Sequence, residues 1–175
     1  MPEATAPGLT LVLGGARSGK SRHAERLVTE TGLARTYIAT AQAWDDEMRA
    51  RIAQHRTDRG QDWRTIEAPI DLAGAIAVEA TPGRAVLVDC LTLWLTNVML
   101  ADRDIAAEEA ALLAALQAAR GPVVCVSNET GLGIVPDNAL ARRFRDAQGR
   151  LNQRIAALAT RVDFIAAGLP IRLKG

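Results

Sequence analysis

The sequence predicts an α/β fold in which a mostly parallel sheet carries helices on both faces. Short runs of Val, Ile and Leu alternate with segments of helical periodicity along the whole chain. This alternation is typical of parallel strands, which are buried on both faces and joined by helices. A length of 175 residues fits one domain with a substantial core. We therefore expect a disordered leader over residues 1–8 and a single folded domain over residues 9–175.

The first part of the chain opens with LTLVLGG at 9–15, an apolar run that predicts a buried strand ending in glycines. A helix is expected over 18–32, where apolar residues recur with helical spacing and Gly32 supplies the C-terminal cap. RTYIAT at 35–40 predicts the second strand. The next helix, over 45–59, has acidic residues at its N-terminal end, where the helix dipole favours them.

The middle of the chain continues this alternation. A short strand over 62–69 is followed by a helix over 70–80 and by the strongly apolar strand RAVLVDC at 84–90. Helical periodicity fills most of 91–120, and the polar stretch Asp102–Asp104 predicts a break within it. These elements widen the predicted sheet without introducing a linker or a second domain.

The last part of the chain contributes the remaining strands. GPVVCVSNE at 121–129 predicts another buried strand. A long amphipathic helix is expected over 136–161 with Pro136 at its start, where the missing N–H is tolerated. VDFIAAGLPIRLK at 162–174 predicts a final strand, a turn and an edge strand.

Charge and composition argue against several classes of partner. The net charge of +1 gives no excess that would favour nucleic acid or an acidic membrane surface. The most hydrophobic stretch, residues 85–100, is interrupted by Asp89 and Asn97 and is too short to span a bilayer. Because the N-terminus does not resemble a signal peptide, we expect a cytoplasmic protein. In that compartment Cys90 and Cys125 are expected as buried, reduced thiols.

The segment GGARSGKS at 14–21 matches the P-loop pattern, in which two glycines separated by four residues are followed by lysine and serine. It lies between a predicted strand and a predicted helix, which is the context this motif requires. Backbone N–H groups of such a loop surround phosphate oxygens, and the helix N-terminus adds positive potential. We expect Lys20 to reach the β- and γ-phosphates and Ser21 to bind Mg²⁺. The domain is therefore expected to bind nucleotides and act as the catalytic unit.

A P-loop site needs a second carboxylate for the metal, and Asp89 at the end of a predicted strand supplies one. In the competing interpretation, Asp89 is the N-cap of the helix that begins near Leu91. The presence of the P-loop favours the role as a metal ligand, because such a site requires a second carboxylate. The following strand ends in the polar residues Ser127, Asn128 and Glu129, at the sheet edge where ligands bind. Their roles stay open because capping and turn formation explain them almost as well.

One of the two histidines, His55, lies within MRARIAQHRTDRG and is a candidate nucleophile. Met48, Ile52 and His55 have i, i+4 and i+7 spacing, which predicts that the imidazole shares the face that packs inward. Arg51 and Arg59 are its i±4 neighbours, and nearby cations favour the neutral imidazole that a nucleophile needs.

Two kinds of chemistry remain open for this helix. Attack of His55 on phosphorus would form a phosphoramidate, with Arg56 and Arg59 holding triphosphate oxygens beside it. A cationic helix face that only binds phosphates explains the same residues equally well. The chain has no Asn-Lys-x-Asp run of the kind that recognises guanine. The residues alone therefore leave the base and the reaction unidentified.

Five segments carry a wider resemblance: GGARSGKSRHAE (14–25), YIATAQAWDDEMRARIAQHRTDR (37–59), WRTIEAP (63–69), VLVDCLTLWLTN (86–97) and NETGLGIVP…LARRFRDAQGRLNQRIA (128–156). In this order they resemble the bifunctional adenosylcobinamide kinase/adenosylcobinamide-phosphate guanylyltransferase family of cobalamin biosynthesis. The resemblance covers nearly the whole chain beyond the leader. No motif position departs from the family pattern, which accepts Asp or Glu where this chain has Asp89.

The resemblance implies a RecA-like P-loop fold that assembles as a homotrimer. It also implies a nucleotide site formed by the P-loop and by four later parts of the chain. The implied nucleotide-binding residues are Gly14, Gly15, Ala16, Arg17, Ser18, Gly19, Lys20, Ser21, Arg22, Thr40, Ala41, Gln42, Arg56, Thr57, Asp58, Arg59, Glu67 and Asp89.

The reaction implied by the resemblance has two halves. The enzyme phosphorylates adenosylcobinamide with ATP or GTP. It then transfers GMP from GTP, through a guanylylated histidine, to adenosylcobinamide phosphate, which gives adenosylcobinamide-GDP. His55 matches the family's histidine and Lys20 is the second catalytic residue, while Ser21 and Asp89 are expected to hold Mg²⁺.

Two alternatives are kept beside this interpretation. One is a P-loop small-molecule kinase that forms no covalent intermediate, and the other is a non-catalytic nucleotide-binding regulator. We assign no catalytic role to His23, for which packing or proximity to phosphate is expected. Trp63 and Trp94 are expected to pack in the core or at an interface.

Overall fold

The computed structural model describes residues 8–175, apart from the side chain of Arg51. The leader expected over residues 1–8 lies outside the described residues except for Gly8. The strands are β1 (Leu9–Gly14), β2 (Ala34–Ala39), β3 (Trp63–Glu67), β4 (Arg84–Asp89), β5 (Val123–Asn128), β6 (Arg161–Ala166) and β7 (Leu169–Lys174). The helices are α1 (Lys20–Glu30), α2 (Asp46–Arg59), α3 (Leu72–Glu79), α4 (Leu91–Leu100), α5 (Ile105–Ala118) and α6 (Ala139–Leu158).

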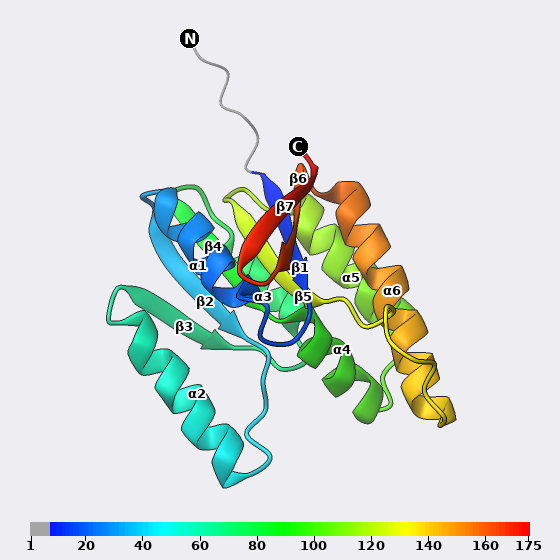
Figure 1. Ribbon diagram of the computed structural model, residues 1–175. Helices are drawn as coiled ribbons and strands as arrows, with labels where there is room; N and C mark the ends of the chain where they lie inside the picture. The colour runs from blue at the N-terminus through cyan, green and yellow to red at the C-terminus, as the bar shows by residue number, and fades with distance from the viewer. Residues whose placement is uncertain (1–7) are drawn as a thin grey trace.

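The strands form one sheet in the order β3-β2-β4-β5-β1-β6-β7 (Figure 1). All neighbouring pairs are parallel except β6 and β7, which are antiparallel at one edge. The predicted sheet, including its terminal edge strand, is confirmed. Ala39 is in register with both Glu67 and Asp89, and Gly14 with Asn128. The carboxyl ends of the central strands therefore lie side by side, where α/β proteins bind their ligands.

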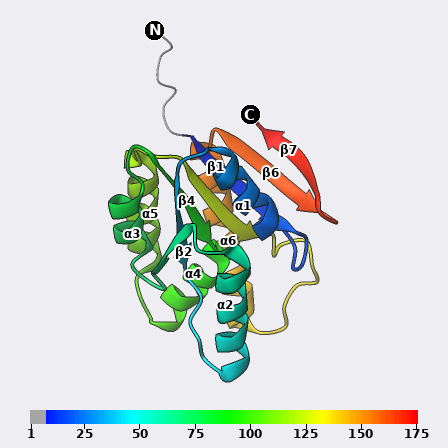
Figure 2. The same cartoon turned by 90° about the vertical axis from the view of Figure 1, so that its left-hand side faces the viewer.

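Helices cover both faces of the sheet, as Figure 2 shows for α1 on one side and α3 and α5 on the other. The larger core joins the sheet to α3, α4, α5 and α6, and the smaller core joins it to α1. Successive residues of β1 serve both, because Leu11 belongs to the larger core and Val12 to the smaller one. Each such side chain stabilises the fold by about 1.5–3 kcal/mol through its removal from water.

The long helix α6 begins later than the sequence predicts. Asn138 caps it, because its side-chain oxygen accepts a hydrogen bond from the backbone N–H of Ala141 at 2.7 Å. The prediction that Pro136 opens this helix is therefore wrong: Pro136 precedes the cap. The helix also ends before 161, because Arg161 is already the first residue of β6. The predicted break near Asp102–Asp104 is confirmed, since it separates α4 from α5.

Both cysteines are free, and the predicted burial of their side chains is confirmed. Burial raises the pKa of Cys90 to about 11 and that of Cys125 to about 12, so both stay protonated near neutral pH. Within residues 8–175, no helix has the length and apolar character needed to cross a membrane.

Candidate functional site

The P-loop joins β1 to α1 at the carboxyl edge of the sheet. A Cβ on Gly14 would lie 2.5 Å from Ser18 Oγ and 2.9 Å from the carbonyl oxygen of Ile165, so only glycine fits there. Gly19 has a φ of 93° and caps the N-terminus of α1. Lys20 Nζ donates a hydrogen bond to the carbonyl oxygen of Gly15 at 2.9 Å, which folds the side chain back over the loop. The loop thus has the tight turn and the helix N-terminus that a phosphate site requires.

A cavity of about 510 Å³ opens beside this loop. Its walls come from the P-loop, from the carboxyl ends of β2, β4 and β5, and from α2 and α4. The lining residues are Ala16, Arg17, Lys20, Ser21, Tyr37, Ala39, Ala41, Met48, Ile52, His55, Asp89, Cys90, Thr92, Leu93 and Asn128. The structure therefore brings Lys20, Ser21, His55 and Asp89 to one cavity, although the sequence separates them widely.

Ser21 and Asp89 face this cavity as the two predicted metal ligands. Asp89 does not cap α4, because Cys90 occupies the N-cap position and makes no side-chain capping bond. A hydroxyl and a carboxylate are hard oxygen ligands of the kind Mg²⁺ prefers, and that ion commonly completes its shell with water and substrate phosphates. Groups of three or more potential metal ligands are absent from the described residues. The donor set therefore fits a magnesium ion bound together with a nucleotide.

His55 is exposed, so the prediction that it lies on a buried face is wrong. Met48 and Ile52 on the same face are only half-buried, and α2 contains no fully buried residue among those described. Helical spacing correctly groups these three residues, which all line the first cavity. It cannot distinguish a face that packs against the core from one that borders an open cavity. Exposure leaves the imidazole accessible to a ligand.

Arg59, one helical turn beyond His55, stacks on Tyr37. Its Cζ lies 3.4 Å from the centre of the Tyr37 ring. Burial raises the pKa of Tyr37, and the nearby Asp89 carboxylate raises it further, whereas Arg59 opposes the shift. Burial also raises the pKa of Glu25, again opposed by Arg59 and increased by Asp89. Arg59 therefore lies within electrostatic range of both the Tyr37 ring and the Glu25 carboxylate.

A second cavity, of about 590 Å³, adjoins the first between α2 and the ends of β2 and β3. Ala39, Ala41 and Ile52 line both cavities. Most of the later nucleotide-binding residues that the resemblance implies lie here. They are Gln42, Arg56, Thr57 and Glu67, in addition to the shared Ala41. The two cavities therefore adjoin each other on neighbouring faces of α2, with Ile52 between them.

Eight residues implied by the resemblance line neither cavity: Gly14, Gly15, Ser18 and Gly19 of the P-loop, together with Arg22, Thr40, Asp58 and Arg59. Thr40 is fully buried, and its hydroxyl donates to the Cys90 carbonyl at 2.7 Å and accepts from the Cys90 N–H at 2.8 Å. Asp58 accepts a hydrogen bond from Gln54 on its own helix, and Arg22 is exposed on α1. Thr40 thus fixes the backbone that follows Asp89 and makes no cavity surface of its own.

The polar residues at the end of β5 have different roles. Ser127 is buried and donates to Asn152 Oδ1 at 2.7 Å, so it belongs to the packing of α6. Glu129 Oε1 accepts from the Gly131 N–H, which closes a turn. Of these three residues, whose roles the sequence left open, Asn128 is the one that lines the first cavity. Tyr37 was missed, although its place near the end of β2 was the available signal.

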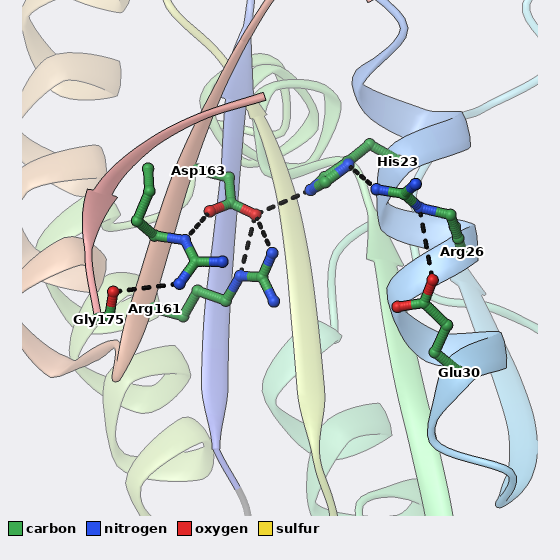
Figure 3. A network of polar contacts seen from close by, with 7 residues as sticks. His23, Arg26, Glu30, Arg161, Asp163 and Gly175 are labelled. Atoms are coloured by element: carbon green, nitrogen blue, oxygen red, sulfur yellow. Dashed lines mark hydrogen bonds and ion pairs between the residues drawn. The ribbon is translucent and has the colours of Figure 1, made fainter. Parts of the chain in front are cut away.

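His23 lies away from the cavity in a buried polar network (Figure 3). Its Nε2 is 2.8 Å from Asp163 Oδ2, and its Nδ1 is 3.2 Å from Arg26. The packing role is therefore the one the structure supports. Trp94 is buried and its Nε1–H donates to the Ile70 carbonyl at 2.8 Å, which confirms its place in the core.

The family described as cobinamide kinase / cobinamide phosphate guanyltransferase matches residues 10–173. The chain belongs to this family. The bifunctional adenosylcobalamin biosynthesis protein CobP of Pseudomonas aeruginosa is 56% identical over 167 residues, which cover 94% of this chain and 96% of the relative. The corresponding protein CobU of Escherichia coli is 43% identical over 181 residues, covering 95% of this chain and 99% of the relative. The family resemblance drawn from the five segments is confirmed.

Solved structures show the same RecA-like P-loop architecture. The RadB recombinase gives a TM-score of 0.54 at 17% identity, covering 91% of this chain and 74% of that chain. The flagellar accessory protein FlaH from Methanocaldococcus jannaschii gives 0.52 at 14% identity, covering 97% and 79%. At these identities the likeness is one of fold, and it confirms the predicted fold class.

Proposed function

We propose that this cobinamide kinase / cobinamide phosphate guanyltransferase family member acts first as an adenosylcobinamide kinase and then as an adenosylcobinamide-phosphate guanylyltransferase. The observation that carries the proposal is the single cavity lined by Lys20, Ser21, Asp89 and His55. Lys20 and the loop amides suit transfer of a terminal phosphoryl group. An accessible histidine in the same cavity suits a second reaction, in which nitrogen attacks a phosphorus atom.

In the kinase half, the triphosphate of ATP or GTP occupies the P-loop. The aminopropanol hydroxyl of adenosylcobinamide attacks the γ-phosphorus, the bond to the bridging oxygen breaks, and the nucleoside diphosphate leaves. Lys20 and the loop N–H groups stabilise the charge that develops on the phosphate oxygens. Ser21 and Asp89 would hold Mg²⁺, which supplies further charge neutralisation at the phosphates when bound.

In the guanylyltransferase half, an unprotonated ring nitrogen of His55 attacks the α-phosphorus of GTP. The α–β phosphoanhydride bond breaks and pyrophosphate leaves, which gives a guanylylated histidine. A phosphate oxygen of adenosylcobinamide phosphate then attacks the same phosphorus. The P–N bond breaks, and adenosylcobinamide-GDP leaves with His55 restored.

The two cavities support one placement of GTP for this second half. The guanosine would lie in the second cavity, near Gln42, Arg56 and Glu67, and the phosphates would extend into the first. Arg56 and Thr57 offer donors to a nucleotide, and Glu67 offers an acceptor.

We also propose that the protein assembles as a homotrimer. The exposed side chains of Leu132 and Ile134 support this state, because they form apolar surface suited to burial between subunits. Sedimentation velocity would test it.

Parallel incubation with α-labelled and γ-labelled GTP, each with Mg²⁺, tests the covalent step. We expect only the α-label to remain on the denatured protein, in an acid-labile and alkali-stable linkage. His55→Ala should abolish this label. Retention of no α-label under conditions where GTP binds would overturn the guanylyl-histidine. A kinase without a covalent intermediate would then be the better description, above all if phosphoryl transfer survived His55→Ala.

A further inference from the structure

Helix α2 carries the proposed nucleophile, yet it contributes no fully buried side chain among the described residues. Its contacts with the rest of the fold come from half-buried residues on one face. Met48 and Ile52 border the cavities there, and Arg59 reaches the sheet in the last turn. The stack of Arg59 on Tyr37 is therefore the best-defined anchor of this helix.

The Tyr37 ring, on which Arg59 stacks, is itself held firmly in place. Only 6% of its surface is exposed, and it belongs to β2, which pairs with a strand on each side. The edge of one ring meets the face of the other in its contact with Trp63, at 6.3 Å between ring centroids and 81° between planes. The ring is thus held by the sheet on one side and by an aromatic neighbour on another.

Arg59 depends on this ring for its position. Within the described part of the chain, its Nε and Nη1 atoms are buried and lack a hydrogen-bond partner. Glu25 lies near enough for Arg59 to oppose the rise of its pKa, but among the described residues Arg59 forms no ion pair with Glu25 or Asp89 within 4.0 Å. A planar cation desolvated over an aromatic face is strongly attracted to it. The stack, rather than directed hydrogen bonds, locates the guanidinium.

We propose that Tyr37 is a positioning residue for guanylyl transfer: through Arg59 it fixes the last turn of α2 and so the place of His55 in the cavity. This inference rests on the proposed function. His55 and Arg59 are four residues apart, so they lie on one face of the helix and move together. Rotation or withdrawal of this turn would carry the imidazole away from the α-phosphorus. Misplacement by about 1 Å is enough to slow a reaction about 10²-fold.

Tyr37→Leu removes the ring while keeping an apolar side chain, and Tyr37→Phe keeps the ring. Phe164→Leu is the matched control, because Phe164 is a partly buried aromatic residue of β6 that packs on the opposite core. For each protein we would measure the single-turnover rate of α-label transfer to His55, the apparent affinity for GTP and the rate of phosphoryl transfer. The melting temperature is measured in parallel.

Tyr37→Leu should slow guanylylation at saturating GTP by about tenfold or more, equivalent to about 1.4 kcal/mol in the barrier. Phosphoryl transfer should fall by a much smaller factor, so the ratio of the two rates changes. Tyr37→Phe should restore that ratio, and Phe164→Leu should leave it at the wild-type value. Arg59→Lys, which keeps the charge but not the planar stack, should lower guanylylation, and combining it with Tyr37→Leu should add little further loss.

The outcomes separate this inference from the proposed function. If the wild-type protein acquires no α-label, the guanylyltransferase proposal fails. If it does and Tyr37→Leu is labelled as fast, Tyr37 has no positioning role. Equal loss of both rates together with a lowered melting temperature would show a purely structural role and would also overturn the inference.

Discussion

Nε2 of His23 lies 2.8 Å from Oδ2 of Asp163, although the two residues are 140 positions apart in the chain (Figure 3). The same carboxylate accepts hydrogen bonds from Arg161 at 2.7 Å and from Arg172 at 2.6 Å. It therefore joins the P-loop helix α1 to both strands of the C-terminal hairpin. A single buried charge with three donors holds the last part of the chain against the first.

Asp163 should make folding depend on pH in acid. Burial by itself raises the pKa of Asp163, but the hydrogen bonds from Arg161, His23 and Arg172 outweigh burial and lower it to about 2. Because the folded-state pKa is lowered, the stabilisation is complete above the unfolded value near 4 and is lost as the pH falls towards 2. We expect this one group to contribute about 2 kcal/mol of pH-dependent unfolding free energy.

Urea denaturation of the wild type and of Asp163→Asn at a series of pH values measures this contribution. At pH 7 the variant should be less stable by about 3–5 kcal/mol, because its arginines lose a buried charged partner. The difference in unfolding free energy between wild type and Asp163→Asn should shrink by about 2 kcal/mol on acidification. Asp146→Asn is the control, since that carboxylate pairs with Arg145 at an exposed site. A constant difference between wild type and Asp163→Asn across this range would contradict the prediction.

Lys20→Ala should abolish most phosphoryl transfer while leaving the fold intact. Loss of a cationic donor at the developing phosphate charge is expected to lower the rate by about 10²- to 10³-fold. Loss of its bond to the Gly15 carbonyl should cost about 1 kcal/mol of stability at most. Lys174→Ala is a matched control, because its Nζ also bonds backbone carbonyls, on α6, far from the P-loop. A phosphoryl-transfer assay measures the rate, and a thermal melt measures the stability. If the Lys20→Ala enzyme kept a near wild-type rate, the proposed role of Lys20 would be excluded.

The parts of the site that the sequence predicted are those encoded locally. The segment 14–21 predicts its own loop, because the glycines, Lys20 and Ser21 are adjacent and lie between a strand and a helix. The role of Asp89 in the site could be predicted because a charged residue at the end of a buried strand has few other structural explanations. The alternation of strands and helices likewise predicted the parallel sheet, since each strand is marked by its own apolar run.

Other features depend on contacts that no local pattern contains. The spacing of His55 indicated the right helix face, but whether that face is covered depends on how α2 sits against β2. The stack of Arg59 on Tyr37 and the bond between His23 and Asp163 join distant segments. Thr40 was predicted as a nucleotide contact, yet its hydroxyl is used by the Cys90 backbone. Such roles follow from tertiary packing.

Thr40 should act through the backbone of Cys90. In Thr40→Val the Cys90 N–H and C=O are left buried without their partner, which should lower the unfolding free energy by about 1–3 kcal/mol. Thr40→Ser keeps the hydroxyl and should retain most of that stability. Urea denaturation measures the difference. If Thr40→Val were as stable as wild type but bound GTP poorly, Thr40 would be a direct nucleotide contact after all.

One nucleotide should bind per chain, and the two half-reactions should compete for it. The two cavities share Ala39, Ala41 and Ile52, so the proposed placement, with the triphosphate in the first and the nucleoside in the second, would use both cavities for one nucleotide. Calorimetric titration with GTP should therefore give one site per chain. Because ATP would occupy the same P-loop, rising ATP should lower the α-label that His55 acquires from labelled GTP. Two independent nucleotide sites per chain, or α-labelling insensitive to ATP at concentrations that saturate the kinase half, would show that the half-reactions use separate sites.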